Sequence, residues 1–211
     1  MTSYQGSHPA AGASAGLRLY GRRVVLRPLT PADFPTWSEV RLRNEEWLIP
    51  WEPRRPPRLA DPARTREAFS ARCAARDRER QAGTAFGFGV FVDNAFAGEI
   101  NLNGIVRGAM HGGTIGYWID RERAGHGYIA EGVAVVLRFA FDEVHLHRVE
   151  ICIVPRNANS RRVVEKLQIR DEGLALRFIE INGVWEDHIR YAITAEEWHE
   201  RRDELVRTWI G

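Results

Sequence analysis

The chain has 211 residues, of which 44% are hydrophobic and 27% are charged. These fractions are close to those of globular domains and exclude a wholly disordered chain. The 30 basic and 28 acidic residues give a net charge of +2, which is too balanced to indicate nucleic-acid binding. No run approaches the ~20 apolar residues that a membrane helix needs. We therefore expect a protein that binds neither nucleic acid directly nor a membrane.

The N-terminal segment and the cysteines indicate how the chain is organised and where the protein acts. Residues 1–16 lack the basic start and apolar centre of a signal peptide, so we expect a flexible tail there. Residues 17–211 are expected to form a single domain. Cys73 and Cys152 are too few for a disulfide framework and lack the spacing of metal ligands. A cytoplasmic protein without a bound metal fits these features best.

The first third of the chain predicts a strand, two helices and a loop. Residues 22–30 read as a strand that ends at Thr30, a residue suited to capping the next helix. Helical spacing follows over 33–46. Prolines interrupt the apolar segment 47–53, which predicts a loop. An arginine-rich helix is expected over 61–81, with either a solvated face or an acidic partner.

The middle of the chain predicts a meander of strands over 86–92, 96–105 and 114–120. A turn at Asp93-Asn94 joins the first two strands. Side chains on a strand alternate between its two faces. In the second strand this alternation predicts one face with Phe96, Gly98, Ile100 and Leu102 and an opposite face with Glu99, Asn101 and Asn103.

The last part of the chain predicts helices between strands. The expected elements are a helix over 128–144, a strand over 149–154, a short helix over 159–167, strands over 174–181 and 185–194, and a tail helix over 195–209. The last two strands pair across Asn182-Gly183, a strong hairpin signal. A crossover helix between strands predicts an α/β (α+β) layer fold with a mixed sheet.

A glycine-bearing loop lies between a strand and a helix in the segment 116–132. Gly125 and Gly127 allow backbone conformations that let successive N–H groups converge. The following helix adds free amides and a positive dipole end, so the loop suits a pyrophosphate. A plain tight turn is the alternative. The spacing matches neither the dinucleotide-binding nor the P-loop motif.

Four ordered segments resemble one family, the GCN5-related N-acetyltransferases (GNATs). Residues 124–132 (AGHGYIAEG) look like its acyl-CoA pyrophosphate loop, whose usual form is Arg/Gln-x-x-Gly-x-Gly/Ala. Residues 146–167 are similar to the next strand and helix in the RimJ/RimL branch of ribosomal-protein-alanine N-acetyltransferases. Residues 23–34 and 48–53 resemble RimJ-type elements. The likeness spans residues 17–194.

Three positions depart from the family pattern. Ala124 stands where the loop motif has Arg or Gln, and Ile129 stands where it has the final Gly or Ala. Gln168 replaces the glycine that usually follows the short helix. Ala124 removes a side chain that could contact phosphate, and Arg121 and Arg123 are the candidates to replace it.

The resemblance implies a mixed, mostly antiparallel sheet of about seven strands flanked by helices, with a C-terminal hairpin and tail helix. It implies direct attack of an amine on acetyl-CoA, the co-substrate, in a ternary complex. It assigns the thioester carbonyl to backbone amides of Tyr117, Trp118 and Ile119, on a strand with a proposed bulge. The other implied acetyl-CoA contacts are Arg123, Ala124, Gly125, His126, Gly127, Tyr128 and Asn157.

Ser160 follows Asn157 in an N-x-x-S motif and has two interpretations. The resemblance makes Ser160 a hydrogen-bond donor or acid for the departing sulfur. The alternative is a structural role, because Asn159 or Ser160 stands where a short helix would begin and could cap it. Both roles can hold at once.

Two carboxylates compete as the general base that takes a proton from the amine. Glu150 lies on the same face of its strand as Arg148, and a salt bridge between them is the alternative. Glu99 lies on the polar face of the meander, with surface exposure as the alternative. His111, His145 and His147 are further proton relays, and Cys152 reads as a small buried hydrophobic residue rather than a nucleophile.

Trp47, Trp51 and the hairpin at Asn182-Gly183 resemble elements that flank the acceptor groove of the superfamily. Packing of the tryptophans in the core is the alternative. Binding residues concentrate on loops, and the prolines around Trp51 predict a loop there.

Three functions remain open at this stage. The first is acetylation of the N-terminal α-amine of a protein or peptide, for example a ribosomal protein. The second is acetylation of a small amine such as an antibiotic or polyamine. The third is a non-catalytic sensor that binds acetyl-CoA. The sequence is compatible with a monomer or a homodimer.

Overall fold

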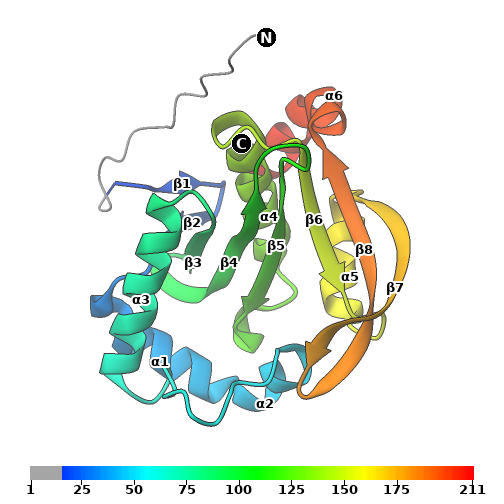
Figure 1. Ribbon diagram of the computed structural model, residues 1–211. Coiled ribbons are helices and arrows are strands. Elements are labelled where there is room, and N and C mark those ends of the chain that lie inside the picture. The colour runs from blue at the N-terminus through cyan, green and yellow to red at the C-terminus, as the bar shows by residue number, and fades with distance from the viewer. Residues whose placement is uncertain (1–15) are drawn as a thin grey trace.

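The computed structural model describes residues 16–211 (Figure 1). Apart from Gly16, the tail expected over 1–16 lies outside the described residues. The strands and helices are β1 (Leu19–Tyr20), β2 (Val24–Arg27), α1 (Phe34–Arg43), α2 (Glu45–Leu48), α3 (Arg66–Gln81), β3 (Phe86–Val92), β4 (Ala95–Val106), β5 (Gly112–Ile119), α4 (Tyr128–Arg138), β6 (Arg148–Ile153), α5 (Ala158–Lys166), β7 (Arg170–Ile181), β8 (Val184–Thr194) and α6 (Ala195–Leu205). In this part of the chain, every helix is too short or too polar to cross a membrane.

The strands form one eight-stranded sheet in the order β1-β2-β3-β4-β5-β6-β8-β7. Neighbouring strands are antiparallel except for β5 and β6, which are parallel. The parallel pair requires a crossover, and α4 provides it on one face of the sheet (Figure 1). This mixed, mostly antiparallel sheet confirms the expected fold class. The strand beyond the expected seven is β1, whose two residues give no alternating signal.

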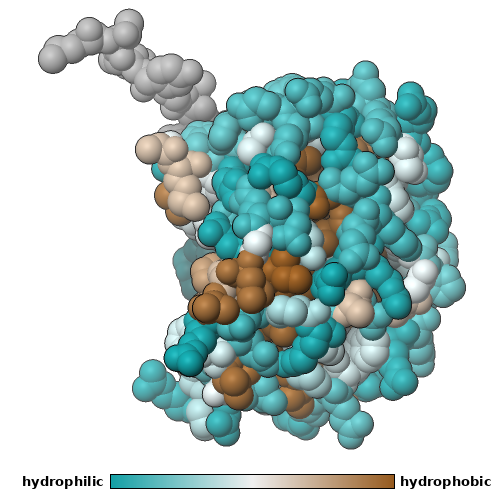
Figure 2. All heavy atoms as spheres, turned by 90° about the vertical axis from the view of Figure 1, so that its right-hand side faces the viewer, coloured by the Kyte–Doolittle hydropathy of each residue, from teal (hydrophilic) through white to brown (hydrophobic). Residues whose placement is uncertain are grey.

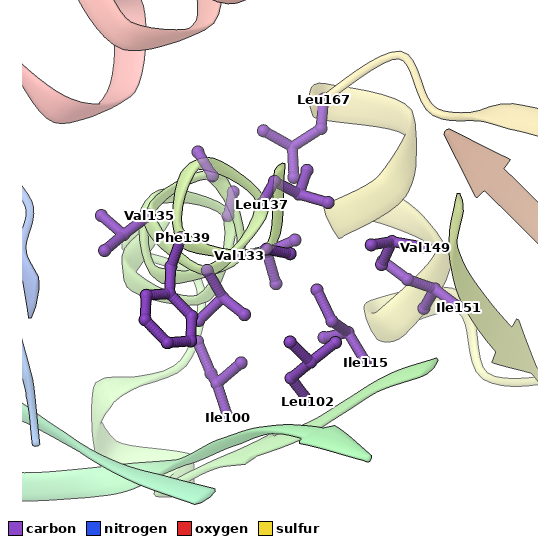
Figure 3. Close-up of a cluster of buried hydrophobic side chains, with 14 of the residues drawn as sticks. Ile100, Leu102, Ile115, Val133, Val135, Leu137, Phe139, Val149, Ile151 and Leu167 are labelled. Atoms are coloured by element: carbon purple, nitrogen blue, oxygen red, sulfur yellow. The ribbon is translucent and has the colours of Figure 1, made fainter. Parts of the chain in front are cut away.

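The main hydrophobic core lies between α4 and the sheet. All residues of α4 from Ile129 to Leu137 are buried, and Glu131 is the one charged residue among them. Figure 3 shows Val133 on the side of α4 that faces Ile100 and Leu102 of the sheet, and Leu137 beside Leu167. This packing fixes the first turn of α4 relative to β4 and β5, and that turn borders the candidate site.

A second hydrophobic cluster lies on the opposite face of the sheet, under α1 and α3. The rings of Trp37 and Phe69 pack there at a tilt of 38°, with centroids 4.7 Å apart, and Phe96 belongs to the same cluster. The prediction that Phe96 shares a face with Ile100 is therefore wrong. The reason is a bulge, because Val90 pairs with Gly98 but Phe91 pairs with Phe96. The extra residue between them reverses the alternation.

Strands β5 and β6 stay paired over only three residues each. The paired residues run from Gly112 to Thr114 in β5 and from Arg148 to Glu150 in β6. Beyond Thr114, β5 continues to Ile119 with β4 as its only partner in the sheet. The carboxyl end of β5 therefore has one edge that is free to bind another molecule.

Two expected helices end differently in the structure. Helix α3 begins at Arg66 rather than at residue 61 because the Thr65 side chain accepts a hydrogen bond from the Ala68 N–H (3.3 Å). The helix expected over 128–144 is α-helical only to Arg138 and continues as a π-helical turn, Phe139–Glu143. The tail helix changes in the same way after Leu205.

The β7–β8 hairpin forms one edge of the sheet and carries several exposed apolar side chains. Figure 2 faces this side of the molecule and shows brown residues among hydrophilic ones. The exposed large hydrophobic residues on the hairpin are Leu174, Leu176, Phe178, Val184 and Trp185. Two register shifts interrupt the pairing of β7 with β8. Such bulges are a common way to prevent an edge strand from pairing with another chain.

Candidate active site

A cleft of about 1060 Å³ runs beside the free edge of β5. One end is lined by the loop before α4 and by α5. The other end is lined by residues from α1, α2, α3 and β4. The volume is at the upper end of the range for small-molecule sites, ~300–1,000 Å³, so the cleft has room for a large ligand or for two substrates side by side.

The glycine loop has the geometry of an anion site. Gly125 and Gly127 have φ angles of +85° and +84°, in the left-handed region that favours glycine. Gly127 directly precedes α4, whose first amides have no partners within the helix and lie at its positive end. The loop residues Arg123, Ala124, Gly125, Gly127 and Tyr128 line the cleft. His126 does not, although its ring centroid lies 5.6 Å from that of Tyr128.

The free edge of β5 presents backbone amides to the cleft. The Asp120 N–H donates to the Ala97 carbonyl (2.7 Å). In an antiparallel ladder, alternate residues face the same neighbouring strand, so the amides of Tyr117 and Ile119 point away from β4. The Trp118 amide faces β4. Of the three amides predicted to hold the thioester carbonyl, only those of Tyr117 and Ile119 are therefore on the free edge.

The bulge expected in β5 is absent. Its residues pair with β4 without interruption from Ile119, opposite Gly98, to Thr114, opposite Asn103. The bulge in this part of the sheet instead lies between β3 and β4, beside Gly98. The divergence of β5 and β6, rather than a bulge, is what exposes the amides.

The start of α5 brings Ser160 to the cleft with a free hydroxyl. The helix cap is Asn157, whose side-chain oxygen accepts a hydrogen bond from the Ser160 N–H (3.1 Å). The prediction that Asn159 or Ser160 caps this helix is therefore wrong. The Tyr117 hydroxyl donates to the Ser160 carbonyl (2.9 Å) and fixes the turn. Burial raises the pKa of Tyr117, so its hydroxyl stays protonated.

Two basic side chains on α5 also line the cleft, and the sequence analysis did not single them out. Arg162 and Lys166 lie four residues apart, on the same face of the helix. The signal that could have found them is this spacing directly after the N-x-x-S motif. Their charges suit the phosphate groups of a nucleotide-containing ligand.

Trp47 and Trp51, which the resemblance places beside an acceptor groove, both line the end of the cleft formed by α1, α2, α3 and β4. We name this end the acceptor end after that expectation. The loop expected over 47–53 is instead helical, because Trp47 lies in α2 and Trp51 ends a 3-10 turn. The Arg156 guanidinium lies 4.7 Å from the Trp51 ring centroid. The Asn182 N–H donates to the Glu52 carbonyl (2.8 Å), so the hairpin contacts this wall, although no residue of the hairpin lines the cleft.

Glu99 lies in the cleft and is nearly inaccessible, with 2% of its surface exposed. The Trp37 indole N–H donates to one carboxylate oxygen (2.6 Å), and Arg72 binds the other. The surface-exposed alternative for Glu99 is therefore wrong. Its partners come from α1 and α3, which the sequence analysis did not connect with β4.

Glu150 does not line the cleft. Its carboxylate accepts hydrogen bonds from Arg148 (2.7 Å) and Arg190 (2.8 Å). Burial raises the pKa of Glu150, but the two guanidinium groups outweigh that and hold it below its ordinary value. The structure brings together Glu99, Ser160 and the glycine loop, and it leaves Glu150 outside this group.

Carboxylates at the acceptor end are matched by arginines. Glu52 binds Arg41 with two hydrogen bonds (2.7 and 2.8 Å), Asp61 binds Arg55, and Glu99 binds Arg72. All of these side chains line the cleft. Each negative charge is thus neutralised before a substrate enters.

A buried polar junction joins the two ends of the cleft. Asn44, at the end of α1, donates to Asp120 (2.8 Å) and accepts from the Arg121 N–H (2.9 Å). Arg43 forms an ion pair with the same Asp120. Asp120 directly follows β5 and begins the loop that leads to Gly125. Helix α1 of the acceptor wall is therefore fixed to the glycine loop.

The three histidines and the cysteine that the sequence singled out, His111, His145, His147 and Cys152, do not line the cleft. His111 contacts the His145 carbonyl (2.7 Å), and His147 pairs with Glu196 at the surface. Cys152 is half-buried rather than buried, and burial raises its pKa to about 11, which opposes a role as nucleophile. Among residues 16–211, no three His, Cys, Asp or Glu side chains are grouped in a way that could hold a metal.

Comparisons with known proteins agree with this geometry. Residues 23–170 match the acetyltransferase (GNAT) domain. The chain is 34% identical to the probable N-acetyltransferase YjcK of Bacillus subtilis, over 83% of this chain and 96% of that protein. It is 29% identical to the ribosomal protein uS5-alanine N-acetyltransferase of Escherichia coli, over 86% and 93%. The solved structure of Mycobacterium smegmatis RimJ in complex with CoA-disulfide superposes with a TM-score of 0.81 and 31% identity, covering 90% of this chain and 92% of that one.

The sheet that opens at β5, the amides on its free edge and the glycine loop before α4 define an acetyltransferase site, and the chain belongs to the GNAT family. Within that family it is an acetyl-CoA-dependent N-acetyltransferase of the RimJ/RimL type. The residues fit acetyl-CoA, because the loop amides, Arg162 and Lys166 suit its phosphates and the free edge of β5 suits its extended arm.

Proposed function

We propose that the acceptor is the α-amino group at the N-terminus of a protein, and that a ribosomal protein is the natural partner. The observation that carries the proposal is the pairing of each acceptor-side carboxylate with an arginine. A polyamine or polycationic antibiotic needs unpaired negative charge in its site. The arginines Arg41, Arg55 and Arg72 already occupy the carboxylates Glu52, Asp61 and Glu99.

Proton affinity also favours an α-amine over a lysine side chain. An α-amine has a pKa of about 7.7–8.0, and lysine about 10.4, a gap of about 2.5 units. Deprotonation of lysine at pH 7 therefore costs roughly 3.4 kcal/mol more. The carboxylate of Glu99 already accepts hydrogen bonds from Trp37 and Arg72, and the amine with the lower pKa places the smaller demand on the site.

Glu99 takes the role of general base, directly or through water, and Ser160 donates to the departing sulfur. The position of Glu99 in the cleft, at the acceptor end, supports its role as base. The Ser160 hydroxyl makes no hydrogen bond with any side chain or backbone group in residues 16–211, and Asn157 and Tyr117 fix the Ser160 backbone. The hydroxyl is therefore available to the sulfur. Positioning of two substrates in one cleft contributes the larger share, up to ~7–11 kcal/mol in well-oriented systems.

The similarity to the uS5-alanine enzyme of E. coli supports the same acceptor class. This comparison names a partner for that protein. For the present chain, modification of a ribosomal protein implies that it acts in the cytoplasm.

Two peptides test the acceptor assignment. One has a free alanine or serine N-terminus and no lysine, and the other is blocked at its N-terminus and has an internal lysine. We expect faster acetylation of the first peptide. Faster acetylation of the blocked peptide would refute the proposal, and acetylation of neither peptide together with turnover of spermidine would establish a small-amine enzyme instead.

A further inference from the structure

A side chain far from the glycine loop in sequence forms a hydrogen bond with the loop backbone. Arg23 lies in the turn between β1 and β2, about 100 residues before the loop, and one guanidinium nitrogen donates to the His126 carbonyl (3.1 Å, separated by 103 positions). The same guanidinium lies 4.9 Å from the Tyr128 ring centroid. Arg23 does not line the cleft, whereas Gly125, Gly127 and Tyr128 do.

Glu131 holds Arg23 in this position. Its carboxylate is 1% exposed and accepts from the Arg23 side chain (2.8 Å) and from the N–H groups of Arg23 (2.5 Å) and Val24 (3.0 Å). Glu131 belongs to the first turn of α4, since its N–H donates to the Gly127 carbonyl (3.0 Å). A side chain on Gly21 would place its Cβ 2.7 Å from the Glu131 carboxylate, so this turn approaches α4 closely.

The geometry of a peptide unit gives this contact its consequence. In a planar trans peptide the C=O and the next N–H point in opposite directions. Arg23 binds the His126 carbonyl from outside the cleft, so the Gly127 N–H is directed to the opposite side. Without an anchor, the peptide between His126 and Gly127 can rotate at low cost, because Gly127, at φ +84°, adopts both signs of φ readily.

We propose that Arg23, held by Glu131, is a positioning residue that keeps the Gly127 amide directed at the pyrophosphate of acetyl-CoA. Ala124 stands in place of the motif's Arg or Gln and has no polar side chain to contact the pyrophosphate. Arg23 compensates for part of the lost affinity by preorganising the loop. Arg121 and Arg123 are less suited to this task, because the Arg121 guanidinium lies 5.5 Å from the Trp47 ring and Arg123 approaches Asp93.

The test compares ligands with and without a pyrophosphate. In Arg23→Gln, we expect CoA affinity by calorimetric titration and kcat/KM for acetyl-CoA to fall about tenfold, the factor that 1.4 kcal/mol represents. The kcat/KM for S-acetylpantetheine, which lacks the pyrophosphate and nucleotide, should change less than twofold. The titration needs no acceptor, so its result is independent of the acceptor assignment.

Arg22→Gln is the matched control. Arg22 is the neighbouring arginine, and its guanidinium donates to the Arg207 carbonyl (2.9 Å) rather than to the loop. This variant should bind CoA like the parent. Melting curves of the variants establish that the fold survives.

Arg23→Lys keeps the positive charge but lacks the planar fork that reaches His126 and Glu131 together. It should therefore lose CoA affinity as Arg23→Gln does. Full affinity in Arg23→Lys would show that charge alone matters and would overturn the proposal. Parental affinity in folded Arg23→Gln, or an equal loss for both thioesters, would overturn it as well.

Discussion

The two ends of the cleft are lined by different kinds of chemical group. The acetyl-CoA end presents mainly backbone amides, from Tyr117 and Ile119 on β5 and from Gly127 before α4. The acceptor end presents side chains, with tryptophans and arginine–carboxylate pairs from separate helices and strands. In the proposed function, backbone amides bind acetyl-CoA, and side chains bind the acceptor. The first kind of site depends on conformation, and the second depends on residue identity.

The largest expected effect separates chemistry from folding at the start of α5. Ser160→Ala should lower kcat by roughly 10–1000-fold, because a hydroxyl that assists the departing sulfur is lost. Its melting temperature should not change, since the hydroxyl does not cap α5. Asn157→Ala, which removes the cap, should instead cost about 1 kcal/mol of stability. Parental turnover in Ser160→Ala would leave Ser160 without a catalytic role.

The next effect tests whether side-chain identity decides function at the acceptor end. Glu99→Gln should lower kcat/KM about 100-fold, because it removes the proton acceptor in the cleft. Glu150→Gln is the matched control, since Glu150 is bound by Arg148 and Arg190 outside the cleft. Kinetics of both variants with one peptide decide between the two carboxylates. A greater loss in Glu150→Gln would reverse the assignment.

A third variant tests the dependence of the acetyl-CoA end on backbone conformation. Gly127→Val should weaken acetyl-CoA binding at least about tenfold, because a β-branched residue at φ +84° is strained by ~1–3 kcal/mol. A Cβ there would meet Arg23 at an ordinary 3.5 Å, so strain rather than collision is the cause. Gly104→Val, at φ +58° and outside the cleft lining, is the control that should lose stability but keep affinity. Equal affinity of Gly127→Val and the parent in a calorimetric titration would contradict this.

The smallest effect concerns the junction that joins the two ends. Burial raises the pKa of Asp120, but Arg43, Asn44 and the Glu122 N–H outweigh it and hold the pKa below its ordinary value. A lowered folded-state pKa adds stability above the unfolded value of about 3.9, and this is lost as the pH falls through the folded value. Asp120→Asn should lower the free energy of unfolding by about 1–3 kcal/mol at pH 7. It should also flatten the acid limb, which is the decrease in the free energy of unfolding as the pH falls. Chemical denaturation at pH 7 and pH 3 measures both, and an unchanged acid limb would exclude Asp120 as its source.

The same contrast explains what the sequence could and could not predict. The glycine loop and the N-x-x-S motif are each contiguous in the chain, so a local pattern is enough to assign their residues to one site. The pairing of Glu99 with Trp37 and Arg72 joins positions 62 and 27 residues apart, and no local pattern records it. The bulge between β3 and β4 places Phe96 in the second hydrophobic cluster. The alternating pattern of the strand does not reveal where an extra residue is inserted, so the face of Phe96 could not be predicted from the sequence.

The contacts of Asn44 with Asp120 and Arg121 limit how such an enzyme can acquire a new substrate during evolution. A substitution at the end of α1 that reshapes the acceptor wall also moves the start of the glycine loop, so it alters the use of acetyl-CoA. Residues 53–60 are exposed and lack such a link. Variation that redirects the enzyme to another acceptor is therefore tolerated best in that segment, and least at the end of α1.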